Sequence, residues 1–205
     1  MSIASLKSAS PERREIVPLT VGQYHSMIEA GILAEGEPIE LLDGLLVRRS
    51  RGEGMTTNPL HSLAVSKLNM RVVAGLAGLP CHVRVQSPIT LPPRDEPEPD
   101  LALIRGLPAD FALQYPGPAD VTCVIEVAGS SLERDRTIKQ RIYATAGISQ
   151  YVIVNLVHSR VEVFGEPDSA QGRYRQRTER SGEEGIALLL PESRRLVISA
   201  ADCLP

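Results

Sequence analysis

The sequence lacks the patterns that mark several protein classes. Its three cysteines, Cys81, Cys123 and Cys203, are far apart and form no Cys-x-x-Cys pair, which argues against a disulfide framework and a zinc site. No apolar run approaches the roughly 18 residues that a membrane-spanning helix needs, so we expect no membrane partner. Residues 1–16 have no apolar stretch of a secretory signal. We therefore expect residues 1–18 to be a flexible leader of a cytoplasmic protein.

Signatures of several common chemistries are missing as well. His25, His82 and His158 have no metal-ligand spacing among themselves. No Ser-His-Asp arrangement stands out, and there is no glycine-rich phosphate loop. Neither a helix-turn-helix nor a zinc finger is present, so no familiar module for reading a DNA sequence can be identified.

Lysine is scarce, because nearly all basic residues are arginine. The only lysines are Lys7, Lys67 and Lys139, and the formal net charge is −3. This balance argues against a large surface that coats nucleic acid without specificity, although a local basic groove remains compatible with it. A lysine that falls within an acidic cluster is correspondingly less easily explained by chance.

The overall composition is that of an ordinary globular protein. Hydrophobic residues make up 42% of the 205 residues, and the mean hydropathy is −0.06. A chain of this length favours one domain with a substantial core. We expect that domain over residues 19–205, with its core at 19–164 and a peripheral β-rich tail at 165–205.

Local signals predict the first elements. Thr20 to Gln23 has the form of a capping box, which predicts a helix that ends before Gly31. Asp43-Gly44 separates two apolar runs and predicts a β-hairpin. Asn58, followed by proline, predicts the start of a second helix. The residues expected on the packing face of that helix are Leu60, Leu63, Ala64, Leu68, Val72 and Val73.

The second half alternates between strands and one helix. A helix is expected at 132–146. Strands are expected at 83–86 and 89–91, which could also form one bent strand, and at 100–104, 121–127, 151–155, 160–164, 173–178, 186–190 and 196–198. This order predicts an α/β fold in which a mixed β-sheet is flanked by helices.

Two carboxylates lie at the ends of predicted buried strands. Asp100 begins one apolar run and Glu126 stands near the end of another. A carboxylate inside an apolar run is costly to bury unless it is paired or metal-bound, so a functional role is favoured for Glu126. Asp100 is equally explained as a solvated residue at a strand edge. Two such carboxylates together would suit Mg²⁺ or Mn²⁺, which prefer oxygen ligands.

Lys139 follows in the predicted helix. Asp135, Lys139 and Tyr143 are four residues apart and share one helix face. Taken alone, the first two are best explained as a solvated surface pair worth a few tenths of a kcal/mol. The position of the helix, directly after the strand with Glu126, would nevertheless allow Lys139 to reach the carboxylates.

Two further residues are weaker candidates. Glu40 lies in the apolar run 39–42 and could complete a metal shell, or it could point to solvent. His61, just inside the second helix, could contact phosphate or water, although a lone histidine there is more often a surface residue.

These residues resemble a known family. Asp100 after proline, with Glu126 at a strand end, resembles the PD-(D/E)XK nuclease superfamily and its restriction-endonuclease-like fold. More closely, the chain is similar to the bacterial Uma-two family of endonucleases over about residues 19–164. The matching stretches are 39–44, His61, 96–100, 124–127, 135–143 and 146–154.

The resemblance implies Mg²⁺-dependent hydrolysis of phosphodiester bonds, with Mn²⁺ as an alternative. It implies Asp100 and Glu126 as metal ligands, joined by Glu40 and the Val127 carbonyl as candidates. The superfamily usually has lysine two residues after the glutamate, where this chain has Ala128. The family moves that lysine to the following helix, and Lys139 is the matching residue, expected to position water or offset negative charge.

The expected function is therefore a metal-dependent DNA endonuclease. Candidate phosphate contacts, each equally explained as ordinary surface charge, are Arg48, Arg49, Arg51, Arg134 and Arg136. A homodimer is expected from the class, because cutting both strands needs two sites. The alternative is a catalytically inactive module that keeps the fold for nucleic-acid binding or protein assembly. Ala128 and the negative net charge favour that alternative, whereas the retained acids and Lys139 count against it.

Overall fold

The computed structural model describes residues 16–34, 36–49 and 58–205. Most of the expected leader and Arg51 lie outside these ranges. The helices are α2 (Val21–Glu29), α3 (Pro59–Gly75), α4 (Leu132–Arg134), the π-helical turn η3 (Asp135–Lys139), α5 (Gln140–Thr145), α6 (Ala200–Cys203) and the 3₁₀ turns η2 (Pro108–Phe111) and η4 (Pro191–Ser193). The strands are β1 (Ile39–Leu42), β2 (Leu45–Arg48), β3 (Cys81–Val85), β4 (Leu101–Arg105), β5 (Val121–Ala128), β6 (Gln150–Asn155), β7 (Arg160–Asp168), β8 (Arg173–Arg180), β9 (Gly185–Leu189) and β10 (Arg195–Ser199).

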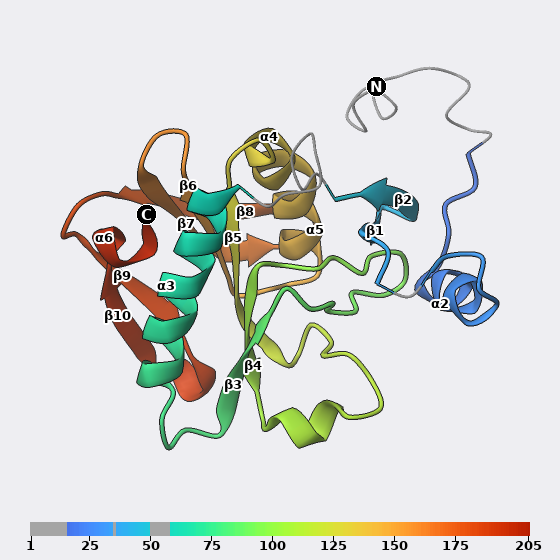
Figure 1. Cartoon of the computed structure of the whole chain (residues 1–205), viewed down its shortest axis with the longest axis horizontal. Helices are drawn as coiled ribbons and strands as arrows, with labels where there is room; N and C mark the ends of the chain where they lie inside the picture. The colour runs from blue at the N-terminus through green and yellow to red at the C-terminus, as the bar shows by residue number, and fades with distance from the viewer. Residues whose placement is uncertain (1–15, 35, 50–57) are drawn as a thin grey trace.

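A six-stranded mixed sheet forms the centre, in the order β3-β4-β5-β6-β7-β8. Only the β5–β6 pair is parallel within this sheet, and the helical segment α4–α5 makes the crossover between the two strands. The remaining pairs are antiparallel. The expected mixed sheet with flanking helices is therefore confirmed (Figure 1).

Both faces of the sheet are covered, so β5 is buried along its whole length. One face packs against α3, α6 and the β9–β10 hairpin, and the other packs against α4–α5 (Figure 1). Side chains alternate between the two faces along a strand. Ile125 and Val127 accordingly join the α3 core, whereas Val124 and Ala128 join the α5 core. Glu126 lies between them on the α5 side.

The predicted boundary signals of the first elements are confirmed. Thr20 caps α2 with a complete capping box, and Asn58 caps α3 through a bond to the Leu60 amide. Asp43 and Gly44 have φ values of 53° and 72°. Two positive φ values in succession are those of the tight hairpin turn that this residue pair favours.

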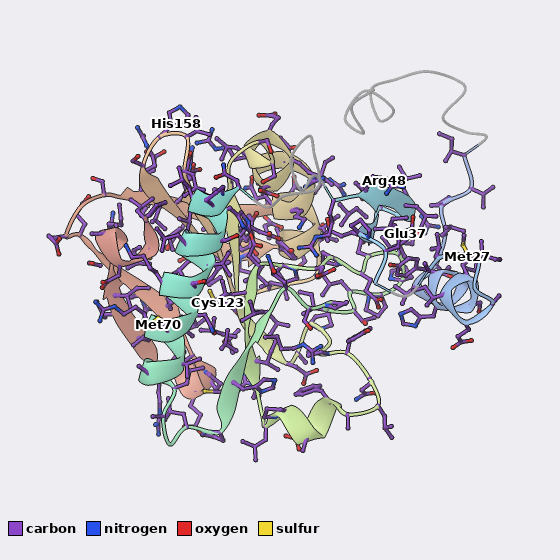
Figure 2. All side chains as sticks on the ribbon, viewed as in Figure 1. Met27, Glu37, Arg48, Met70, Cys123 and His158 are labelled. Carbon is purple, nitrogen blue, oxygen red and sulfur yellow. The ribbon has the colours of Figure 1, made fainter. Side chains whose placement is uncertain are left out.

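Part of the predicted face of α3 is wrong. Leu60, Leu63 and Val73 are exposed, whereas Val65 is buried. The buried stripe runs through Ala64, Leu68 and Val72 as expected, and it also includes Val65, which the sequence does not place on this face. Figure 2 shows Met70 on the outer side of the same helix.

Among the described residues, no helix is long and apolar enough to cross a membrane.

Two strand predictions also change. Residues 89–91 form no strand in the described structure, and Leu91 makes only an isolated bridge with Asp95, because prolines at 88, 92 and 93 interrupt the ladder. The C-terminal segment is β-rich as expected, but it is not peripheral. Strand β8 completes the central sheet, and β9–β10 supplies Ile186 and Ile198 to the core.

Gly44 provides a test of the hairpin. A Cβ at Gly44 would lie 2.5 Å from the Pro18 side chain and 2.7 Å from the Leu19 carbonyl oxygen. Gly44→Ala should lower the free energy of unfolding by about 2 to 4 kcal/mol, through the left-handed backbone and this clash together. Gly78 has a similar φ of 76° with open space around it, so Gly78→Ala should cost only about 1 to 2 kcal/mol. Equal losses in urea unfolding would show that the contact with residues 18–19 contributes nothing.

The surroundings of Glu162 predict how the free energy of unfolding depends on pH. This fully buried carboxylate accepts hydrogen bonds from Arg136, Asn155 and Arg177. Burial favours its neutral form, but the bonds from Arg136 and Asn155 outweigh burial and hold the pKa of Glu162 below its ordinary value. The stabilisation is therefore present above the unfolded-state pKa and lost as pH falls through the lower folded-state pKa.

Glu162→Gln should accordingly lower the free energy of unfolding by about 1 to 3 kcal/mol at pH 7. The difference from wild type should shrink as the pH falls below about 4. Urea titrations at several pH values measure it, with exposed Glu183→Gln as the control. A difference that stays constant down to pH 3 would contradict this account.

Candidate active site

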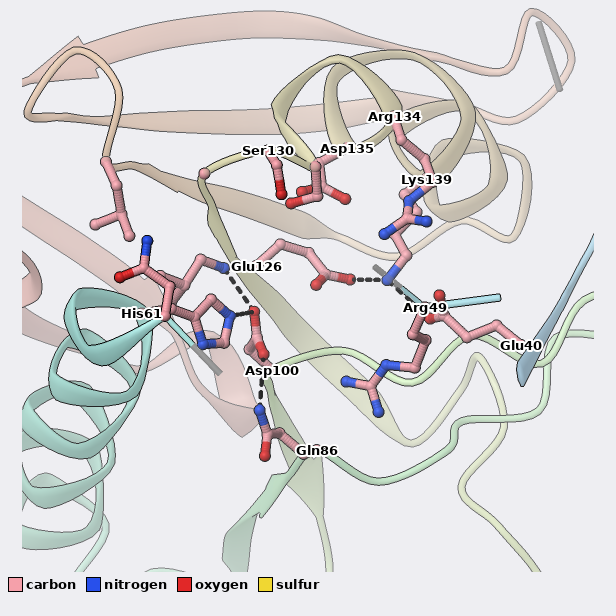
Figure 3. A pocket seen from close by; sticks show the side chains of 15 residues that line it. Glu40, Arg49, His61, Gln86, Asp100, Glu126, Ser130, Arg134, Asp135 and Lys139 are labelled. Carbon is pink, nitrogen blue, oxygen red and sulfur yellow. Dashed lines mark hydrogen bonds and ion pairs between the residues drawn. The ribbon is translucent and has the colours of Figure 1, made fainter. Parts of the chain in front are cut away.

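Four of the candidate residues converge in one cavity of about 270 Å³ beside the sheet. Asp100 lies immediately before β4, Glu126 comes from β5, Lys139 ends η3, and Glu40 comes from β1. Their exposed fractions are 5%, 4%, 3% and 1% respectively. Figure 3 shows Glu126 and Glu40 pointing to Lys139 between them, and Asp100 beside Glu126 with dashed bonds to His61 and Gln86. The structure thus brings together residues that are up to 99 positions apart in the chain.

The sheet register explains how the two strand acids meet. Leu101 of β4 pairs with Ile125 of β5 in an antiparallel ladder. The preceding residue, Asp100, therefore lies opposite the residue after Ile125, which is Glu126. The Asp100 carboxylate is further fixed by the backbone of β5, because the Val127 N–H donates to Asp100 Oδ2 at 2.8 Å.

Lys139 joins two acids at the centre of the cavity. Its Nζ lies 2.8 Å from Glu126 Oε1 and 2.8 Å from Glu40 Oε1. The Tyr143 hydroxyl donates to the same Glu126 oxygen at 2.8 Å. The interpretation of Asp135 and Lys139 as a solvated surface pair is wrong, since they are 2% and 3% exposed. Asp135, Lys139 and Tyr143 share one helix face, as their spacing indicated. That face packs toward the sheet and is not exposed to solvent.

The local helix geometry departs from the prediction. The helix expected at 132–146 contains a π-helical turn over Asp135–Lys139. Such a turn inserts one extra residue into the hydrogen-bonding cycle and often occurs at functional sites. It lies at the level of the carboxylates and ends on Lys139. The backbone carbonyl of Asp135 also accepts a bond from the buried Tyr151 hydroxyl at 3.0 Å.

The buried acids and Lys139 shift the pKa values of one another. Burial raises the pKa of Glu126 to about 8, against the opposing effect of Lys139, and the nearby acids Asp135 and Asp100 raise it further. Burial alone would deprotonate Lys139, but Glu126 and Glu40 outweigh it and raise the pKa of the ammonium. Lys139 therefore stays charged, whereas Glu126 holds a proton more readily than an ordinary carboxyl group.

Asp100 remains ionised in the same surroundings. Burial favours the neutral acid, but hydrogen bonds and the charge of His61 outweigh it and hold the pKa of Asp100 below its ordinary value. His61 Nε2 lies 3.1 Å from Asp100 Oδ2, and this bond raises the pKa of the imidazole. His61 therefore contacts a site carboxylate, and the alternative of an ordinary surface histidine does not hold.

Glu40 is buried in the cavity wall with one oxygen unsatisfied. Its Oε1 accepts the Glu98 N–H at 2.8 Å in addition to Lys139. Its Oε2 is buried and has no hydrogen-bond partner among the described residues. A carboxylate oxygen left in this way is costly. The expectation that Glu40 might simply face solvent is wrong.

The arginines divide into two groups. Arg49 and Arg134 line the cavity, and Arg49 forms an ion pair with Glu98. Arg48 lies outside it, with a side chain that is 70% exposed and 3.6 Å from Glu37 (Figure 2). Arg136 also lies outside it, because successive residues leave a helix on different sides and this one points to Glu162. Arg48 and Arg136 are thus not part of the cavity, and their expected contact with a phosphate backbone stays a prediction.

Asp135 and Gln86 are among the cavity residues that the sequence does not single out as site residues. Asp135 was noted only as part of a helical pair, and its exclusion from solvent depends on packing. Gln86 was placed in a strand, yet it follows β3 and its Nε2 donates to Asp100 Oδ1 at 3.2 Å. No local motif marks Gln86, since its partner is 14 positions away.

The donor set is chemically suited to a hard divalent cation. It consists of buried carboxylates, and one of them, Glu40, has a buried oxygen with no hydrogen-bond partner among the described residues. Within residues 16–34, 36–49 and 58–205, however, no three His, Cys, Asp or Glu side chains are arranged as a ready metal cluster. Lys139 instead contacts both Glu126 and Glu40.

Lys139 can be tested by removing its charge. Lys139→Met leaves Glu126 and Glu40 buried without their counter-ion, so the free energy of unfolding at pH 7 should fall by about 3 to 5 kcal/mol. Lys67 is a matched control, because it bonds to the Ala201 and Leu204 carbonyls rather than to an acid. Lys67→Met should cost about 1 kcal/mol. Equal losses in urea unfolding without divalent cations would rule out a special role for the buried ion pairs.

Comparisons with known proteins agree with this fold. A search of curated proteins finds no match. A solved structure described as "a putative nuclease belonging to DUF820 from Anabaena variabilis ATCC 29413" superposes with a TM-score of 0.66 at 13% sequence identity, covering 91% of this chain and 97% of that chain. At this identity the likeness shows the fold. The profile of the Uma2 family, described as "Putative restriction endonuclease", matches residues 21–199. The chain therefore belongs to the Uma2 family.

Proposed function

We propose that this protein is a metal-dependent endonuclease that hydrolyses phosphodiester bonds in DNA. The observation that carries the proposal is that Asp100, Glu126 and Glu40 line one cavity, in which Glu126 and Glu40 both contact the buried ammonium of Lys139. A purely structural ion pair would need one carboxylate for one lysine. This cavity gathers four buried acids, Glu40, Asp100, Glu126 and Asp135, and shifted pKa values of this kind are common at functional sites.

Asp100, Glu126 and Glu40 would hold Mg²⁺ or Mn²⁺, with the Val127 carbonyl as a further ligand. Such an ion lowers the pKa of a bound water and offsets charge on the phosphoryl group. Asp100 is suited to this role because it stays ionised, as its lowered pKa indicates. Glu40 brings the buried oxygen that has no hydrogen-bond partner among the described residues.

Lys139 would stabilise negative charge at the reacting phosphate. Its raised pKa means that it donates hydrogen bonds and does not act as a base near neutral pH. Positioned donors of this kind stabilise charge that develops in a transition state. The lysine expected two residues after the glutamate is replaced by Ala128, and the helix supplies the ammonium to the Glu126 oxygen instead.

The mouth of the cavity offers groups that suit a polyanionic substrate. Arg134 and Arg49 provide positive charge, and Asn58, Ser130 and Ser131 provide side-chain donors. His61 also lines the cavity and would contact phosphate or water there. We take DNA as the substrate class from the description of the family as restriction endonucleases.

We further propose that residues 19–205 act as one domain and that two copies assemble for double-strand cleavage. The shared central sheet supports the first point, since its residues contribute to the cores on both faces. The second point rests on the chemistry alone, because two strands require two sites.

Nicking of a supercoiled plasmid tests the proposed activity. The wild-type protein with Mg²⁺ or Mn²⁺ should convert the plasmid to open circles. Asp100→Asn and Glu126→Gln should each slow the reaction by about 100-fold or more, since each removes a charge that the reaction uses. Exposed Glu183→Gln is the matched control and should leave the rate unchanged.

Calorimetry with Mn²⁺ separates this proposal from a noncatalytic module. Wild-type protein should bind the ion, and Glu126→Ala should bind it at least tenfold more weakly. Plasmid binding without nicking under any of these conditions would support the noncatalytic module. Nicking that persists unchanged in Asp100→Asn would remove the acids from the mechanism.

A further inference from the structure

Gln86 has a backbone conformation that its residue type rarely adopts. It directly follows β3, its φ is +45°, and its N–H donates to the Asp100 carbonyl at 3.0 Å. Turns that need a left-handed residue usually have glycine or asparagine there. Gln86 is also exposed and contributes nothing to the core. Neither turn formation nor core packing therefore explains why the position has a glutamine side chain.

The side chain of Gln86 turns back to the cavity. Its Nε2 donates to Asp100 Oδ1 at 3.2 Å, so Gln86 binds the same residue through its backbone and its side chain (Figure 3). Holding a long exposed side chain in one conformation costs conformational entropy. The left-handed backbone together with the inward side chain indicates a local arrangement directed at Asp100.

The number of acceptor sites on Asp100 indicates the effect of the hydrogen bond from Gln86. An ionised carboxylate has two oxygens and about four acceptor sites. Oδ2 already accepts from the Val127 N–H at 2.8 Å and from His61 at 3.1 Å. Oδ1 accepts from Gln86 alone among the described residues. The remaining acceptor site is therefore on Oδ1, and Gln86 determines the direction in which it points.

We infer that Gln86 is a positioning residue, which holds Asp100 so that its free Oδ1 acceptor site faces the cavity. This inference rests on the proposed function, in which that site is offered to a divalent cation. Hydrogen-bond partners of metal ligands typically change metal affinity by about 10- to 100-fold when they are removed.

Two substitutions separate the side chain from the backbone. Gln86→Met keeps the length of the side chain and removes the donor, and Gln86→Gly removes the side chain while suiting the positive φ. Both should weaken Mn²⁺ binding, measured by calorimetry on the full chain, by about tenfold or more. Gln86→Gly should do so without lowering the unfolding temperature, a combination that a merely structural role would not produce. Gln114→Met, at an exposed glutamine, is the control and should bind Mn²⁺ like wild type.

Crystal structures without metal give a second measurement that does not depend on metal binding. In Gln86→Met the Asp100 carboxylate should rotate or occupy two orientations, whereas Gln114→Met should retain the wild-type orientation. An unchanged Asp100 orientation in Gln86→Met, or Mn²⁺ affinity within twofold of a metal-binding wild type, would overturn the inference. If wild-type protein bound no Mn²⁺, the proposed function would fail, and the orientation of Asp100 would still decide the role of Gln86.

Discussion

The buried ammonium of Lys139 is the interaction on which the cavity depends. Transferring a carboxylate out of water costs several kcal/mol even after the protein relaxes, and Glu126 and Glu40 are both almost completely buried. Lys139 contacts both at 2.8 Å. Arg49 and Arg134 also line the cavity, but Lys139 is the cation that contacts both of these acids. Four buried acids in one cavity, all with shifted pKa values, make a catalytic interpretation more economical than a structural one.

The central sheet imposes the geometry around this charge. With both faces of β5 covered, the alternation that sends Val124 and Ala128 into the α5 core must also direct Glu126 there. The parallel β5–β6 pair requires a crossover, and the helical segment that makes it carries Lys139 and Tyr143 over the acid. The connection that the topology needs is thus the same segment that supplies the counter-ion.

The sequence could predict those features that depend on local spacing. The capping box at Thr20, the Asp43-Gly44 turn and the mixed sheet all follow from short-range signals. The convergence of the strand acids could be anticipated, because adjacent strands bring their ends together. The roles of Asp135 and Gln86 could not, since burial and a left-handed backbone depend on residues distant in the chain. The α3 face was misjudged for a related reason, because the crossing angle of a helix on a sheet is decided by both surfaces.

The replacement of lysine by Ala128 becomes intelligible from the packing. Ala128 faces the same side of β5 as Glu126, is fully buried, and lies in the core that includes Ile138 and Tyr143. A lysine there would have to displace side chains that fix α5 on the sheet, at a cost of the kind that overpacking brings. A lysine on the covering helix, such as Lys139, contacts Glu126 without disturbing the packing of α5 on the sheet. A lysine at strand position 128 and a lysine in the covering helix are therefore alternative ways to place an ammonium near Glu126. The helical lysine requires a small residue at position 128.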